Sequence, residues 1–195
     1  MESIINDICE KLIQYQIVSK KDIPIYQYGL KILLLKIAYI TSFILYALLI
    51  GMLKETVLFL IVYSLLRAYG GGYHASSIPK CYVVSLTTVI LNSILCKVIV
   101  TDILFRVEII LLGLSSIVIC CLSPVDNHEK QLDNVEKKVY NQRAQITVGC
   151  CLFLFMMILS ILNMSDIMAT AVSNAVILES TMMILGEIKN LKQQK

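Results

Sequence analysis

The residues with the clearest chemical potential are His74 and Cys81, which share one polar segment between two strongly apolar runs. That segment, residues 67–81, reads Arg-Ala-Tyr-Gly-Gly-Gly-Tyr-His-Ala-Ser-Ser-Ile-Pro-Lys-Cys. An imidazole can take the proton of a thiol, and the resulting thiolate is the nucleophile of cysteine enzymes. The two residues are therefore a candidate general base and nucleophile.

The glycines and the proline of this segment argue against a continuous helix. Each of Gly70, Gly71 and Gly72 would cost about 1 kcal/mol relative to alanine inside a helix. We expect instead a loop that returns His74 to a Cys81 at the start of the next helix, where the macrodipole favours a thiolate. Backbone N–H groups of the three glycines are candidates for stabilising an oxyanion.

The His–Cys spacing alone does not distinguish a catalytic pair from two unrelated structural residues. Metal binding is not expected, because no further His or Cys lies nearby and the seven cysteines form no C-x-x-C pattern. The sequence predicts no cofactor.

The chain around this segment has the composition of a membrane protein. Of its 195 residues, 57% are hydrophobic and only 16% are charged, whereas a soluble domain is about 45–50% apolar. The charges gather between apolar runs, which predicts an all-α membrane protein with about six transmembrane helices in one domain. The runs cover approximately residues 32–50, 56–66, 82–96, 107–122, 144–164 and 167–186. The second run is short, and the sequence does not settle whether it crosses the membrane.

Two polar regions flank the apolar runs. Residues 1–24 have apolar side chains at helical spacing and predict an amphipathic helix on the membrane surface, either as a simple anchor or as a docking surface. Residues 123–143 predict a charged loop. A net charge of +3 gives no reason to expect a nucleic-acid partner.

The distribution of basic residues predicts the orientation in the bilayer. With six spans, all Lys and Arg residues except Lys54, Lys97 and Arg106 fall on one side. The positive-inside rule then places both termini, and with them His74 and Cys81, at the cytoplasmic face of the cell membrane.

The segment around His74 resembles that of the accessory gene regulator B (AgrB) family of membrane cysteine endopeptidases. The matching residues are Arg67-Ala-Tyr-Gly-Gly-Gly-Tyr-His74-Ala-Ser, followed after a short linker by Cys81. The resemblance implies a homodimer that processes an AgrD-like quorum-sensing propeptide. Cys81 would cleave at the C-terminal end of the future signal and form a thioester, and a Cys or Ser inside the peptide would then close a thiolactone or lactone ring.

Other residues are candidates for binding substrate. Arg67 could pair with the acidic C-terminal tail that the family's substrates carry, or it could be a helix-end arginine that reaches the headgroups. The remaining candidates are basic and include both residues near Cys81 and residues of the charged loop: Lys80, Lys130, Lys137 and Lys138. Glu108 and Asn92, inside apolar runs, are candidates for contacts between helices or between copies.

Two functions of other classes remain open from the residues alone. A small peptide transporter would need functional polar residues near the middle of the membrane and would tolerate loss of Cys81. A non-enzymatic membrane sensor or assembly partner would tolerate replacement of both His74 and Cys81.

Overall fold

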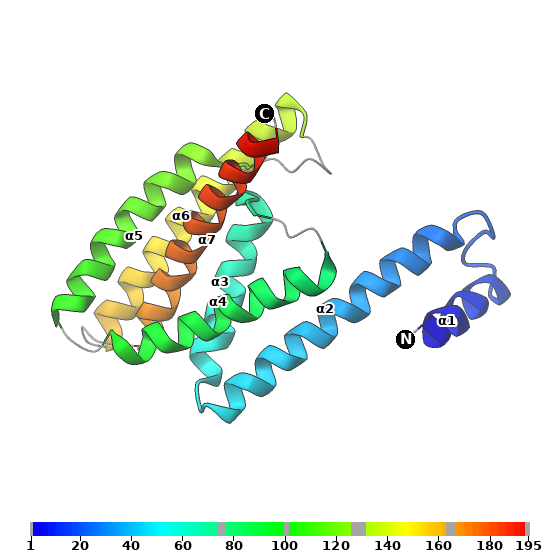
Figure 1. The fold of residues 1–195 in the computed structure, drawn as a ribbon, viewed down its shortest axis with the longest axis horizontal. Coiled ribbons are helices and arrows are strands. Elements are labelled where there is room, and N and C mark those ends of the chain that lie inside the picture. Colours follow the sequence, from blue (N-terminus) through cyan, green and yellow to red (C-terminus); the bar gives the residue numbers. More distant parts are fainter. Residues whose placement is uncertain (1, 74–76, 100–101, 126–131, 163–166, 194–195) are drawn as a thin grey trace. The chain divides into compact units, whose positions relative to one another are not determined.

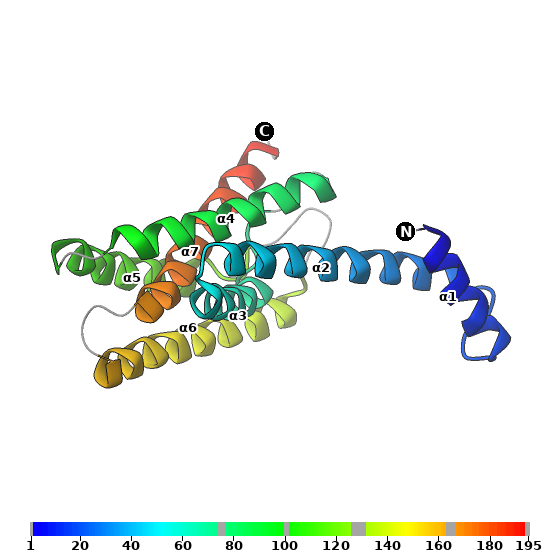
Figure 2. The same ribbon diagram turned by 90° about the horizontal axis from the view of Figure 1, so that it is seen from below.

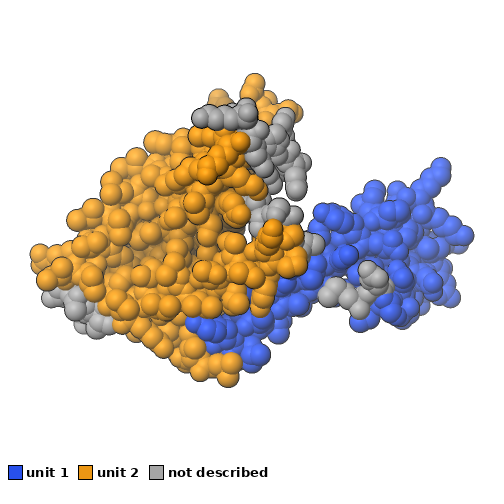
Figure 3. Space-filling model, in the orientation of Figure 1, with its two compact units in different colours: residues 1–46 blue, residues 47–195 orange. Residues whose placement is uncertain are grey.

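The computed structural model describes residues 2–73, 77–99, 102–125, 132–162 and 167–193, and these residues form helices with no strand. The helices are α1 (Glu2–Gln14), α2 (Ile23–Leu49), α3 (Leu53–Gly70), α4 (Ile78–Val98), α5 (Asp102–Leu122), α6 (Asn134–Leu162) and α7 (Ile167–Gln193) (Figure 1). The chain divides into two compact units, residues 1–46 and residues 47–195 (Figure 3).

The smaller unit contains the expected amphipathic helix. In α1 the side chains of Ile5 and Cys9 are buried, while Asp7 and Glu10 are exposed. The Gln27 side-chain amide donates a hydrogen bond of 3.1 Å to the Asn6 carbonyl oxygen and so links α1 to α2. A helix at the N-terminus is therefore confirmed, but it covers only residues 2–14 of the predicted segment 1–24.

Within the described residues, five helices are long and apolar enough to cross a membrane: α2, α4, α5, α6 and α7. Helix α3 has 18 residues, which corresponds to a length of about 27 Å, slightly less than a typical hydrocarbon core. It also carries Lys54, Glu55 and Arg67. The all-α membrane fold is confirmed, and α3 corresponds to the short second run.

Helix α7 is the centre of the larger unit. It contacts α3, α4, α5 and α6, and it lies among them in both ribbon views (Figures 1 and 2). Within its membrane-crossing part 67% of the residues are buried, against 11–33% in the other candidate spans. Ala169, Ala171 and Ala175 are fully buried, and such small side chains allow helix backbones to approach closely.

Polar side chains join α7 to its neighbours. Glu108 of α5 accepts hydrogen bonds from the hydroxyls of Thr170, at 3.4 Å, and Ser173. The Asn174 side-chain amide donates to the Asn92 carbonyl oxygen of α4 at 3.1 Å. Glu108 and Asn92 therefore make contacts between helices, which was one of the two expectations for them.

The charged segment 123–143 is only partly a loop. Helix α6 begins at Asn134, so Lys137, Lys138 and Arg143 belong to its first turns. The Asp133 backbone N–H donates to the Glu136 carboxylate at 3.1 Å, and the Lys137 N–H donates to the Asp133 carbonyl at 2.8 Å. A carboxylate reaching back in this way caps a helix N-terminus, which explains why the helix starts inside the charged segment.

Candidate functional site

Cys81 lies in the first turn of α4. Ser77 has extended backbone geometry and precedes the helix, Pro79 occupies its first turn, and the Cys81 N–H donates to the Ser77 carbonyl at 3.0 Å. Proline suits this turn because the first N–H groups of a helix have no partner within it. The Cys81 side chain is exposed. The expected position at a helix N-terminus is confirmed.

His74 lies outside the described residues, together with Ala75 and Ser76. The structure nevertheless describes the backbone on both sides of them. The Tyr73 N–H donates to the Met182 carbonyl of α7 at 2.9 Å, and the Tyr73 carbonyl accepts a hydrogen bond from Arg67. Tyr73, the residue before His74, is therefore attached to both α3 and α7.

Arg67 organises the residues that follow α3. Its Nη1 atom donates to the Gly71 carbonyl at 2.6 Å and lies 3.6 Å from Oε1 of Glu179 in α7, while Nη2 donates to the Tyr73 carbonyl. The Glu179 side chain is fully buried and that of Arg67 is 23% exposed. The contacts of Arg67 in this structure are thus made within the chain, whereas its predicted contact with substrate is untested.

The glycines allow close contacts between backbones. Gly71 and Gly72 have positive φ angles, 77° and 104°, which glycine adopts without strain. A Cβ atom on Gly71 would overlap the Val125 carbonyl, and one on Gly72 would lie 2.5 Å from Nη1 of Arg67. The Val125 N–H donates to the Gly70 carbonyl at 2.9 Å. The Gly71 N–H donates to the Arg67 carbonyl at 3.3 Å, and Gly70 is the last residue of α3, where N–H groups donate within the helix. The predicted oxyanion role of the three glycines stays a prediction.

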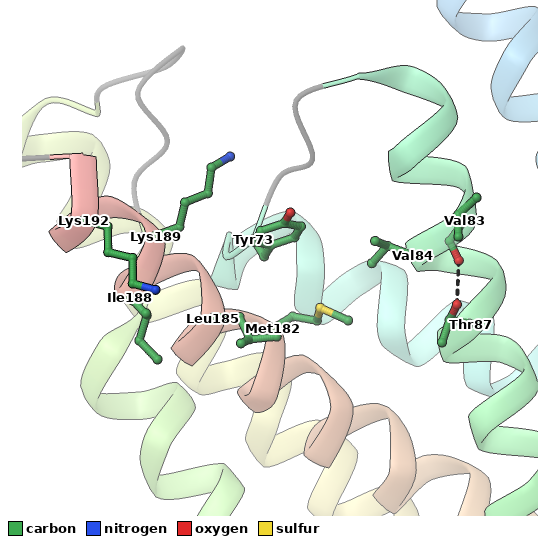
Figure 4. Close-up of a pocket in the computed structure, with 9 residues that line it drawn as sticks. All are labelled: Tyr73, Val83, Val84, Thr87, Met182, Leu185, Ile188, Lys189 and Lys192. Atoms are coloured by element: carbon green, nitrogen blue, oxygen red, sulfur yellow. Dashed lines mark hydrogen bonds between the residues drawn. The ribbon is translucent and has the colours of Figure 1, made fainter.

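A cavity of about 690 Å³ lies between Tyr73, α4 and α7 (Figure 4). Its walls are mostly apolar and include Val83 and Val84 of α4 and Leu185 of α7. The α4 wall begins two residues after Cys81, and Tyr73 immediately precedes His74. The cavity is therefore lined by close sequence neighbours of both candidate catalytic residues.

Two lysines of α7, Lys189 and Lys192, add positive charge to this cavity. The Lys189 Nζ atom lies 5.2 Å from the centre of the Tyr73 ring, a distance at which a cation is attracted to an aromatic face. Lys80 and the α6 residues Lys137 and Lys138 are exposed and do not line the cavity. Lys130 lies outside the described residues.

The comparison with family models matches Accessory gene regulator B over residues 5–185. The chain belongs to the AgrB family. Comparison with curated proteins and with solved structures finds no match. AgrB membership and the five membrane-crossing helices identify a multi-pass membrane protein with a role in the agr quorum-sensing system. The family implies an AgrD-like propeptide as the partner.

The structure identifies further residues at the candidate site that the sequence analysis did not single out. They are Glu179, Gly186, Met182, Lys189 and Lys192, all on α7, and Tyr73 within the motif itself. Glu179 had a detectable signal, because a carboxylate inside an apolar run is rare and usually functional or paired. Gly186 had none, since a helical glycine does not show from the sequence what lies beside it.

Replacing Gly186 by alanine should weaken the contact between α7 and the segment before His74. Its Cβ atom would lie 2.6 Å from the Gly72 carbonyl carbon, and backbone cannot yield as a flexible side chain can. We expect a loss of about 1–3 kcal/mol in the free energy of unfolding, measured by denaturant titration in detergent micelles. Gly149→Ala is the matched control, because nothing lies within 4 Å of its Cβ position in α6. Equal stability of the two variants would contradict the close packing at Gly186.

Proposed function

We propose that this AgrB protein is a cysteine endopeptidase that cleaves its propeptide on the C-terminal side of the signal segment and promotes its cyclisation. The observation that carries the proposal is the exposed thiol of Cys81 in the first turn of α4, beside an apolar cavity whose other walls are α7 and the residue before His74. Cys121 and Cys150 are also exposed, but Cys81 differs from them in sharing one polar segment with His74.

The reaction uses one proton carrier and two nucleophiles. His74 accepts the Cys81 proton, Sγ attacks the scissile carbonyl, and the peptide C–N bond breaks as His74 gives the proton to the leaving amine. The signal segment remains attached as a thioester. A Cys or Ser inside the peptide then attacks that carbonyl, the ring closes, and the Cys81 thiol is restored. An intramolecular nucleophile is favoured over water because it is already held close to the carbonyl.

The cavity suits the part of the propeptide beside the scissile bond. Its apolar walls favour large apolar side chains, while Lys189 and Lys192 favour carboxylates of the peptide. Basic residues at other positions, namely Arg67, Lys80, Lys130, Lys137 and Lys138, remain proposals for further contacts with the acidic tail.

Transport of the peptide is the weaker alternative. It would use polar residues within the membrane, but Glu108 has hydroxyl partners on α7, and Asn174 donates to Asn92. These contacts account for the three residues as links between helices. Neither a passive pathway nor a sensor without chemistry would need Cys81 and His74 together in one polar segment.

Cleavage by Cys81 can be tested with the full chain and its cognate propeptide expressed together. We expect wild-type membranes to release the C-terminal tail and to give a cyclic or enzyme-linked product by mass spectrometry, and Cys81→Ala and His74→Ala to give neither. Cys121→Ala, which removes another exposed thiol, should process normally. Processing by Cys81→Ala at equal membrane levels would overturn the nucleophile assignment.

Substrate binding in the cavity can be tested by filling it. Val84→Trp should raise KM for the propeptide by about tenfold or more, since a larger side chain excludes the peptide's apolar group. Val98→Trp is the control, because Val98 is 55% exposed at the far end of the same helix. KM is obtained from cleavage rates measured over a range of peptide concentrations. An unchanged KM for Val84→Trp would show that the peptide does not bind in this cavity.

The proposed membrane arrangement has both termini and Cys81 at the cytoplasmic face, supported by the distribution of Lys and Arg, and two copies per assembly, supported by family resemblance. In inverted membrane vesicles a membrane-impermeant maleimide should label Cys81, and in intact spheroplasts it should not. Two differently tagged copies should also purify together. Labelling of Cys81 only in intact spheroplasts would contradict the proposed orientation. Failure of the two tagged copies to purify together would contradict the proposed dimer.

A further inference from the structure

Glu179 is a fully buried carboxylate on α7. Its side chain is fully buried in the membrane-crossing part of α7, and within the described residues neither of its oxygens has a hydrogen-bond partner. It forms an ion pair with Arg67, at 3.6 Å. A charge in such surroundings is costly and is usually retained for a function.

Arg67 links this carboxylate to the peptide backbone that follows α3. The guanidinium is planar and presents its N–H groups in a fixed fork. One of its nitrogens faces both Glu179 and the Gly71 carbonyl, and the other donates to the Tyr73 carbonyl. Fixing the guanidinium therefore fixes two carbonyl groups, the second of which belongs to the residue joined to His74.

The space around the pair is closed by glycines. A Cβ atom on Gly70 would lie 3.3 Å from Oε1 of Glu179 and 3.2 Å from Sδ of Met183, and one on Gly72 would lie 2.5 Å from Nη1 of Arg67. The Tyr73 N–H also donates to Met182, less than one helical turn from Glu179. The segment is thus held by α7 through both a backbone hydrogen bond and the Glu179–Arg67 pair.

We infer that Glu179 is a positioning residue for the peptidase site, acting through Arg67 to set the backbone from which His74 extends. The inference rests on the proposed function for its effect on catalysis. It gives Arg67 contacts within the chain in place of the acidic-tail contact proposed above, so loss of Glu179 should impair the chemical step and leave affinity for the propeptide nearly unchanged.

The kinetic test compares Glu179→Gln with Glu108→Gln in full-length protein in proteoliposomes. Glu108 is the matched control, because it is also a buried carboxylate that contacts α7, through Thr170 and Ser173, away from the segment before His74. We expect Glu179→Gln to lower kcat by about 10²-fold, the effect of a small misplacement of a catalytic group, with KM changed less than threefold. Glu179→Asp, which keeps the charge, should recover part of kcat.

Hydrogen exchange gives a readout that does not require cleavage. In Glu179→Gln and in Arg67→Lys, peptides covering residues 68–73 should exchange faster than in wild type, while those of α5 should not change. Circular dichroism of each variant confirms that the helices have formed.

The outcomes separate the two proposals. Faster exchange in residues 68–73 of the Glu179→Gln variant, with no cleavage by wild-type protein, would support the positioning contact and reject the peptidase. Cleavage by wild type together with unchanged exchange and kcat in Glu179→Gln would overturn the inference and leave the peptidase intact. A tenfold rise in KM at constant kcat would instead assign Arg67 and Glu179 to substrate binding.

Discussion

The ion pair between Arg67 and Glu179 is the interaction on which the candidate site depends. It joins the end of α3 to the buried face of α7, and its guanidinium also holds the carbonyls of Gly71 and Tyr73. Neither partner is suited to this environment alone, because an unpaired charge among apolar helices is strongly disfavoured. The pair therefore ties correct packing of the larger unit to correct placement of the residues before His74.

Helix α7 can pack at the centre of the larger unit and still carry Glu179 because it combines small and polar side chains. Its fully buried alanines let α7 lie close to its neighbours, and Ser173 and Asn174 bond to α5 and α4. Lipid provides little hydrophobic driving force between helices, so packing and hydrogen bonds must hold them together. The same helix then supplies Lys189 and Lys192 to the cavity, so one element provides both structural contacts and candidate substrate contacts.

The sequence predicts the all-α membrane fold, the helical N-terminus and the position of Cys81 well, because these depend on local composition and on the helix-breaking effect of Pro79 and the glycines. The start of α6 was not predicted, because residues 123–143 were expected to be a charged loop, although Asp133 and Glu136 have the spacing of a helix cap. The cavity and the partner of Arg67 were not readable. They depend on which face of α7 meets α3, and nearly all of residues 167–186 are apolar or small, so that several faces could pack inward.

The contact between Gly71 and Val125 joins parts of the chain that are far apart in sequence. Val125 follows α5, and its N–H bonds to the Gly70 carbonyl, while Gly71 and Val125 form an isolated parallel bridge. Because Gly71 has no side chain, the two backbone segments can approach this closely: a Cβ atom there would overlap the Val125 carbonyl oxygen. The backbone just before His74 is therefore tied to the residues that follow α5 as well as to α7, so three separate parts of the chain must come together to form it.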